Sequence, residues 1–214
     1  MSATLQISEI FHSLQGESRT SGFPTVFIRL TGCPLRCHYC DTEYAFTGGE
    51  VLLLDSILSD IKPYQTKYIT VTGGEPLAQK ECLTLLTMLC DAGYEVSLET
   101  SGAISLLGVD PRVCIVMDLK TPASGEADKN IWQNLQYLKD DDQIKFVICD
   151  RDDYDWMKTI SDAHDLYQRC EILVSPSFGE INHKELADWI VEDKLPVRFQ
   201  LQLHKLLWDD EPGH

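Results

Sequence analysis

The stretch TGCPLRCHYCDT (residues 31–42) places three cysteines, Cys33, Cys37 and Cys40, within a span of eight residues. It directly follows TVFIRLT, which has the composition of a strand, and Pro34 indicates that the cysteines lie on a loop. A structural zinc site uses four ligands, and disulfides use cysteines in pairs. Three clustered thiols therefore indicate a metal site in which one coordination position is left to another ligand.

Two other metal sites use similar ligands. A zinc ion could take His12 or His38 as a fourth ligand, but zinc sites usually show a second Cys-x2-Cys half, which this sequence lacks. An electron-transfer iron–sulfur cluster needs a fourth thiolate. The remaining cysteines lie singly among apolar neighbours, and we expect them to be small buried hydrophobic side chains: Cys82, Cys90, Cys114, Cys149 and Cys170.

Strand-like and helix-like segments alternate along the chain. The expected strands are residues 5–11, 25–31, 67–72, 94–100, 114–120, 143–149, 171–176 and 197–203, and the expected helices are residues 54–61, 82–93 and 182–193. This alternation predicts an α/β fold with a parallel sheet and right-handed crossovers. With about six to seven barrel strands, we expect an incomplete, partial TIM-type β/α barrel in one domain over residues 1–214, including a short N-terminal strand extension and a C-terminal tail.

Polar motifs follow the expected strands at their carboxyl ends. They are the cysteine stretch, GGEP (73–76), ETSG (99–102), DLKTP (118–122) and SPSFG (175–179). Since the carboxyl ends of parallel strands meet at one edge of a sheet, these motifs predict a shared site there.

The charge and the apolar runs narrow the class of protein. The formal net charge is −16, and such an acidic surface disfavours binding to nucleic acid. No apolar run is long enough to cross a membrane, and the start of the chain does not read as a signal peptide. We therefore expect a cytoplasmic protein with reduced cysteines and a small-molecule partner.

The cysteine stretch carries a resemblance to a known superfamily. Its Cys-x3-Cys-x2-Cys spacing after the first barrel strand, with Tyr39 before the last cysteine, resembles the radical S-adenosylmethionine (SAM) superfamily. The resemblance implies that Cys33, Cys37 and Cys40 ligate a [4Fe–4S] cluster whose open iron binds SAM. An electron from the cluster would cleave SAM, and the resulting adenosyl radical would take a hydrogen atom from the substrate, so no side chain is expected to be the catalytic group.

The same resemblance implies a set of SAM contacts. In this superfamily a GGE motif after the second strand binds the SAM amino group, and the residues that match are Gly74 and Glu75. The other residues implied as SAM contacts are Tyr39, Cys40, Asp41, Gly102, Asp118, Leu119 and Lys120. Many relatives carry a small residue and a proline before the lysine, and this chain departs from them at Asp118 and Leu119.

Three further segments narrow the family. SEIFHSLQGES (8–18), CDT after the last cysteine, and QLQLHKLL (200–207) together resemble the 7-carboxy-7-deazaguanine synthases of queuosine biosynthesis, a tRNA modification pathway, with likeness from Ile7 to about Trp208. The family is a group of carbon–nitrogen lyases that contract the ring of 6-carboxy-5,6,7,8-tetrahydropterin and release ammonia.

This family also implies substrate and metal contacts. Leu14, Gln15, Gly16, Arg29 and Thr100 match its substrate-binding positions, with Arg29 on the substrate carboxylate. A further match is a Mg²⁺ ligand, the hydroxyl of Thr42.

Several other residues could line the site. Lys145 alternates with apolar neighbours and could face the interior of the barrel, and Ser175 stands at a strand end. We expect His204 and Lys205 to follow the last strand and cap the sheet. His214 is not expected in the site, because the acidic tail around it would repel an anionic substrate.

Partners and rival functions complete the expectations. The family implies a homodimer and a one-electron donor such as a flavodoxin, with no direct nucleic-acid or membrane partner. A radical SAM activase that acts on a glycyl-radical protein would share the cluster, but it has no use for SLQGE or Arg29. A zinc-binding interaction module is the non-enzymatic alternative, and it would be colourless where a four-iron cluster is brown.

Overall fold

The computed structural model describes residues 3–209 and Gly213. Within those residues the strands form one nine-stranded sheet in the order β3-β1-β2-β4-β5-β6-β7-β8-β9. The strands are β1 (Thr4–Leu14), β2 (Pro24–Leu30), β3 (Glu50–Leu53), β4 (Tyr68–Gly73), β5 (Glu95–Thr100), β6 (Cys114–Asp118), β7 (Gln143–Ile148), β8 (Glu171–Pro176) and β9 (Arg198–Phe199).

Seven of these strands make the parallel part of the sheet. β2 and β4 to β9 pair in parallel, each with the next, while β1 pairs antiparallel with both β2 and β3. β3 and β9 lie at the two edges and the sheet is not closed, which confirms the incomplete barrel. β3, which pairs with β1 at the edge of the sheet, was not predicted from the sequence. With only four residues, it is too short to show a strand pattern.

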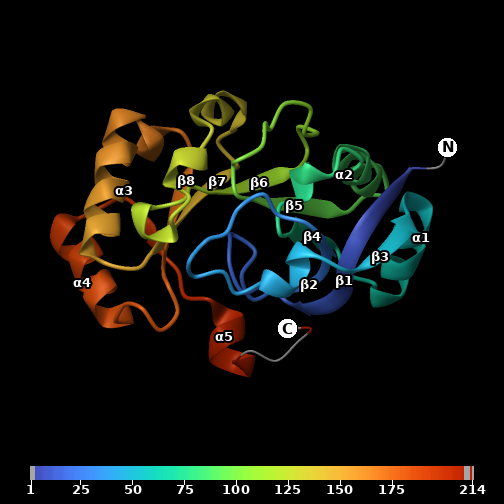
Figure 1. The fold of residues 1–214 in the computed structure, drawn as a ribbon, viewed down its shortest axis with the longest axis horizontal. Coiled ribbons are helices and arrows are strands. Elements are labelled where there is room, and N and C mark those ends of the chain that lie inside the picture. Colours follow the sequence, from blue (N-terminus) through green and yellow to red (C-terminus); the bar gives the residue numbers. More distant parts are fainter. Residues whose placement is uncertain (1–2, 210–212, 214) are drawn as a thin grey trace.

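Five helices accompany the sheet in the described part of the chain: α1 (Leu54–Ile61), α2 (Cys82–Asp91), α3 (Arg151–Ala163), α4 (His183–Asp193) and α5 (Leu203–Trp208). In Figure 1, α1 and α2 lie at the end of the sheet that carries β1 to β5, and α3 and α4 lie at the opposite end. None of the helices in residues 3–209 is both long and apolar enough to span a bilayer. α3 was not predicted from the sequence; its buried face rests on Tyr154 and Met157 within a strongly acidic segment.

Each parallel strand sends alternate side chains to opposite faces of the sheet. On β2, Ile28 and Leu30 are fully buried, whereas Arg29 between them faces the other way. The face toward the helices is apolar, and its core includes Val71, Leu98 and other aliphatic residues of the central strands. The opposite face carries the polar residues. One face of the sheet therefore forms the core, and the other is available for binding.

The end of the chain differs from the sequence prediction. Residues 197–203 were expected to form a strand, but β9 covers only two residues and α5 begins at Leu203. Gln200 N still donates to Val174 O of β8 at 2.9 Å, and beyond it the chain turns into α5. The Gln200 side chain holds Ser18, with Ser18 N donating to Gln200 Oε1 at 2.9 Å and Gln200 Nε2 donating to Ser18 O at 3.0 Å. The prediction that His204 follows a strand and caps the sheet was therefore wrong, since His204 lies on a helix. Residues 210–212 and His214 lie outside the described residues.

The cysteines outside the loop are less buried than predicted. All eight cysteines are free thiols, and of the five scattered ones Cys82 alone is fully buried. Cys90 and Cys170 pack against the core while partly exposed. The prediction of small buried side chains holds for Cys82 and is too strong for the other four.

We expect the substitution Asn182→Ala to lower the free energy of unfolding by about 1 kcal/mol. The Asn182 side chain caps α4, accepting from Lys184 N at 2.9 Å and from Glu185 N at 3.4 Å. Urea denaturation measures this loss, and the slope of the unfolding free energy against urea concentration should be unchanged. Asn182→Asp keeps the acceptor and is the control; equal loss in both variants would contradict the cap.

Candidate functional site

The face of the sheet opposite the helices is unusually polar. We call it the polar face and define it by Glu9, Arg29, Thr70, Glu99, Asp118 and Lys145. Strand register aligns these positions, since Glu9 pairs with Arg29 and Asp118 pairs with Lys145. Charged residues on the inner strands of a sheet are costly without partners or a ligand, so this face is the candidate site.

One loop covers the polar face from the amino ends of the parallel strands. It comprises residues 15–19, directly after β1, and we call it the 15–19 loop. Gln15 is buried and its Nε2 donates to Thr70 Oγ1 on β4 at 2.9 Å. Arg19 N donates to Gln143 Oε1 at the start of β7 at 2.9 Å, and Leu203 N of α5 donates to Gly16 O at 3.0 Å. The loop is thus fixed to both halves of the sheet and to the end of the chain.

The cysteine loop, residues 31–42, covers the same face from the carboxyl ends. Gly32 O accepts from Glu75 N at 2.8 Å, which joins the loop to the GGEP turn. At its other side His38 N donates to Ser124 O at 3.0 Å. Arg36 fastens the loop by donating to Cys33 O at 2.9 Å and by lying over the Phe46 ring at 4.1 Å.

Glycine is required where the GGEP turn meets the cysteine loop. A Cβ on Gly74 would lie 2.5 Å from Gly32 O and 2.6 Å from the Cβ of Cys33. The sequence analysis assigned the glycines to a close approach by SAM. The structure adds that Gly74 also lets the turn pack directly beneath the first cysteine.

The three loop thiols are close enough to influence one another. The pKa of Cys37 is raised to about 11, chiefly by burial, with smaller raising effects from Asp118, Cys40 and Cys33 and a lowering effect from Lys120. Burial likewise raises the pKa of Cys33 and of Cys40. Because a metal takes the thiolate form, ligation here must release protons.

The donor set fits a multi-iron cluster. Among the described residues, no three His, Cys, Asp or Glu side chains converge on a point where they could share one metal ion. Three thiols that each bind a different iron need not converge in that way. The half-buried thiols of the cysteine loop, beside the cationic Lys120, offer one thiolate per iron and a positive charge to balance them.

Buried polar atoms without partners gather around the polar face. The described atoms of this kind are Ser13 Oγ, Glu17 Oε1, Tyr39 OH, Asp118 Oδ1, Ser161 Oγ, Tyr167 OH and Ser175 Oγ. Register places Ser13, Asp118 and Ser175 on the polar face, while Glu17 and Tyr39 lie in the two covering loops. Buried polar groups are normally hydrogen-bonded, so this concentration of unpaired atoms indicates a polar ligand between the loops.

Glu75 is more tightly bound by the protein than the sequence suggested. It is fully buried, and its carboxylate accepts from Leu77 N at 3.0 Å, from Thr100 Oγ1 at 2.9 Å and from Ser101 N at 2.8 Å. The Ser101 hydroxyl donates to it as well. Glu75 therefore joins the end of β4 to the end of β5. The hydroxyl hydrogen of Thr100, the residue expected to contact the substrate, is already donated to Glu75.

The side chains of the DLK segment (118–120) point to different faces of the sheet. Lys120 Nζ pairs with Asp118 Oδ2 at 2.9 Å and lies 5.6 Å from the centre of the Tyr39 ring. The side chain of Leu119 is buried in the apolar core, so Leu119 could contact a ligand only through its backbone. Gly102, with φ +69°, follows β5, and its carbonyl accepts from Asn134 Nδ2 at 2.9 Å.

Arg29 lies on the polar face, as a residue that binds the substrate there would require. Its Nε donates to Glu9 Oε1 at 2.7 Å, and its guanidinium lies 5.8 Å from the ring centres of both Phe11 and Tyr44. Tyr44 OH donates to the same Glu9 oxygen at 2.8 Å. A guanidinium has five N–H donors, and Glu9 accepts from one of them. The contacts with Glu9 and the two rings fix the orientation of the guanidinium plane.

Thr42 ends the cysteine loop in a position suited to a weak cation site. Its hydroxyl donates to Asp41 Oδ1 at 2.6 Å. The hydrogen of the hydroxyl is thereby directed to Asp41, which leaves the oxygen lone pairs for a hard cation.

The sequence analysis missed Glu17 and Glu99. Glu17 contacts the Lys145 ammonium, which confirms that Lys145 faces the interior. Glu99 lies on β5 between the buried Leu98 and Thr100, and burial raises its pKa to about 8. A glutamate at an alternate position of an inner strand was a usable signal for Glu99. Glu17 lies in a loop and had none.

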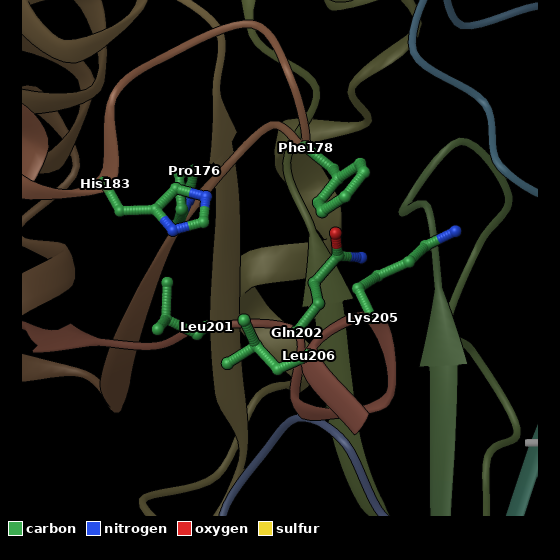
Figure 2. A pocket seen from close by; sticks show the side chains of 7 residues that line it. All are labelled: Pro176, Phe178, His183, Leu201, Gln202, Lys205 and Leu206. Atoms are coloured by element: carbon green, nitrogen blue, oxygen red, sulfur yellow. The ribbon is translucent and has the colours of Figure 1, made fainter. Parts of the chain in front are cut away.

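A small pocket beside α5 is not the site. It lies between the end of β8, the start of α4 and α5, and is lined by Pro176, Phe178, His183, Leu201, Gln202, Lys205 and Leu206. In Figure 2 Gln202 points toward Phe178, and the amine of Lys205 points away from His183. Its volume of about 10 Å³ holds roughly one water molecule, far too little for a nucleoside or a bicyclic ring.

Comparison with known proteins supports the assignment of the cysteine loop. Residues 27–113 match the radical SAM superfamily. The chain is similar to the 7-carboxy-7-deazaguanine synthase of Chlorobaculum tepidum, with 41% identity over 98% of this chain and 96% of the relative. It is 39% identical to the enzyme of the same name from Koribacter versatilis, over 97% of this chain and 98% of the relative.

Solved structures show the same fold. The crystal structure of QueE from Escherichia coli matches with a TM-score of 0.79 at 22% identity, over 94% of this chain and 95% of that chain. SuiB of Streptococcus suis, bound to S-adenosylmethionine, matches with a TM-score of 0.56 at 13% identity, over 83% of this chain and 47% of SuiB.

We expect Gly16→Ala to displace α5 from the 15–19 loop. The new methyl group would overlap His204 Nδ1 and lie 3.1 Å from the backbone nitrogen of His204. Such overpacking typically costs about 1–3 kcal/mol, and limited proteolysis of the C-terminal segment would detect the displacement. Adding His204→Ala removes the ring and should restore much of the resistance. An unaltered cleavage rate in the single variant would rule out the contact.

Proposed function

Because the chain belongs to the 7-carboxy-7-deazaguanine synthase family of the radical SAM superfamily, we propose that it converts 6-carboxy-5,6,7,8-tetrahydropterin to 7-carboxy-7-deazaguanine. Ammonia is the only other product, so substrate and products balance without net oxidation. The observation that carries the function is the end-to-end identity with relatives of that name, joined to three free thiols over a polar sheet face.

The protein's first task is to hold the cofactors. We propose that Cys33, Cys37 and Cys40 bind a [4Fe–4S] cluster and that Lys120 offsets part of its negative charge. When bound, the cluster and SAM supply one-electron chemistry that ends in hydrogen-atom abstraction from the substrate. Proposed SAM contacts, carried over from the family, are Tyr39, Cys40, Asp41, Gly74, Glu75, Gly102, Asp118, Leu119 and Lys120.

The orphaned atoms support part of this SAM site. Tyr39 OH and Asp118 Oδ1 are buried without partners at the cysteine-loop end of the polar face, where a ligand with donors and acceptors would satisfy them. Glu75 has four protein donors already, so we propose that it acts mainly by fixing the loop geometry.

The second task is to orient the pterin. We propose that residues 14–16 bind it from the amino ends of the strands, while Arg29 binds its carboxylate and Thr100 borders it. Thr42 would hold a Mg²⁺ ion that also engages the substrate carboxylate. The two covering loops exclude water around the reacting carbon, which a carbon-centred radical requires.

Partners follow from the same proposal. We propose a flavodoxin-like electron donor that docks near His38, whose side chain is 71% exposed on the cysteine loop. We also propose a single-domain, cytoplasmic homodimer. The edge strand β3 exposes Val51 and Leu53, which gives a second copy an apolar edge to cover.

The test is anaerobic reconstitution followed by mass spectrometry of the products. We expect a brown protein with about four irons per chain that forms the deazaguanine product from carboxytetrahydropterin. Cys37→Ala should lose the iron and all SAM cleavage. A colourless zinc protein, or cluster and SAM cleavage with no product from the pterin, would overturn the proposal.

We expect Arg29→Ala to raise KM for the pterin by roughly tenfold or more, since a hydrogen bond to a charged group contributes about 1.5–3 kcal/mol. Cluster content and SAM cleavage without substrate should persist. Steady-state kinetics under anaerobic conditions measure the change. Arg112→Ala, which breaks the ion pairs of the half-exposed Arg112 with Asp110 and Asp91, is the matched control. An unchanged KM would remove Arg29 from the site.

We expect Thr42→Val to blunt activation by Mg²⁺, because valine keeps the shape of threonine and lacks the oxygen ligand. Thr42→Ser should retain most of the activation. Thr47→Val changes an exposed threonine of the neighbouring segment and serves as the control. The measurement is the reaction rate as a function of Mg²⁺ concentration. If the parent protein and the three variants show the same dependence on Mg²⁺, Thr42 is not a ligand.

A further inference from the structure

A buried ion pair joins the 15–19 loop to the middle of the sheet. Lys145 Nζ contacts Glu17 Oε2, and the two side chains are only 9% and 13% exposed. The other Glu17 oxygen, Oε1, is buried without a partner. A buried charge pair is costly to assemble and very costly to break, so its placement beside residues 14–16 calls for a specific role.

Lys145 is shared among several carboxyl groups. Burial alone lowers its pKa, but Glu17, Asp118 and Glu99 together raise it above its usual range. Asp118 already has a partner in Lys120. The ammonium of Lys145 contacts Glu17 on the loop, and Glu99 on β5 is near enough to influence its charge.

The groups that face Glu99 come from four elements. They are Lys145 on β7, Glu17 on the 15–19 loop, Asp118 on β6 and Arg29 on β2. His204 on α5 faces Glu17 and Lys145 from the far side, and burial lowers its pKa. Glu17 and Asp118 oppose ionisation of Glu99, whereas Lys145 and Arg29 favour it, so the direction in which Lys145 points decides the balance.

We propose that Glu17 is a positioning residue that locks the 15–19 loop to β7 through Lys145 and keeps that ammonium directed at the loop, so that Glu99 reports the direction in which Lys145 points. This inference rests on the proposed function, because it assigns the locked loop to pterin binding. Two other loop contacts, Gln15 to Thr70 and Ser18 to Gln200, join neutral groups. Arg19 pairs with Glu171 at 3.9 Å and with Asp141 at 3.4 Å, but its side chain is 43% exposed. Among these described ion pairs of the loop, the Glu17–Lys145 pair is the buried one.

The test is pH-difference infrared spectroscopy of the anaerobic holoenzyme, with Glu99→Gln used to assign the carboxyl band. In the parent protein we expect Glu99 to ionise at a pH of about 8. Glu17→Gln removes an opposing charge and releases Lys145, so the midpoint should fall by about one unit. Lys145→Gln removes a favourable charge, so the midpoint should rise. Midpoints that stay fixed, or that move in the same direction, overturn the proposal.

Kinetics test the loop. We expect Glu17→Gln to raise KM for the pterin by roughly tenfold, with a smaller change in kcat. Lys158→Gln, which breaks the ion pair with Asp193 between α3 and α4, is the matched control and should leave KM unchanged. An unchanged KM in Glu17→Gln would overturn the positioning role.

The double variant Glu17→Gln, Lys145→Gln keeps the proposal testable if a single variant does not fold, since it leaves no unpaired buried charge. Its two effects on Glu99 oppose each other, so the midpoint should stay near that of the parent while KM stays raised. A parent-like KM would overturn the lock. The infrared titration needs no turnover, so failure of the parent protein to form product would count against the proposed function alone.

Discussion

Alternation of side chains along the parallel strands is the constraint on which the rest of the structure depends. On β2 and its neighbours, aliphatic residues point to the helices and charged residues point away from them. The apolar side supplies burial, which is the main stabilising contribution to folding. Because that side is enough to hold the sheet together, the opposite side can carry a concentration of charge that no ordinary core would tolerate.

Two loops turn that charged surface into an enclosed site. The cysteine loop approaches from the carboxyl ends of the strands and the 15–19 loop from the amino ends. The first is held by the backbone bond from Glu75 N of the GGEP turn to Gly32 O, beside Gly74, where a Cβ would not fit. The second is held by side chains, including a buried ion pair. The two loops thus cover the same polar surface from opposite ends of its strands.

Sequence predicted the parts of the molecule that have local signals. The thiol spacing, the GGEP turn and the strand–helix alternation each depend on residues close together in the chain. α3 was missed because acidic residues dilute its apolar stripe. The last strand is shorter than predicted because the chain turns into α5, whose Leu203 N donates to Gly16 O, a partner far away in sequence. Glu17 and the true setting of Glu75 depend on partners far away in sequence, which no local pattern records.

The bond from Leu203 N to Gly16 O has a consequence for biosynthesis of the protein itself. It joins the 15–19 loop to α5, which follows it by almost the whole sheet along the chain. During translation the cysteine loop emerges well before α5 is made. The wall that α5 adds to the 15–19 loop can therefore form only after all the strands of the sheet have been synthesised.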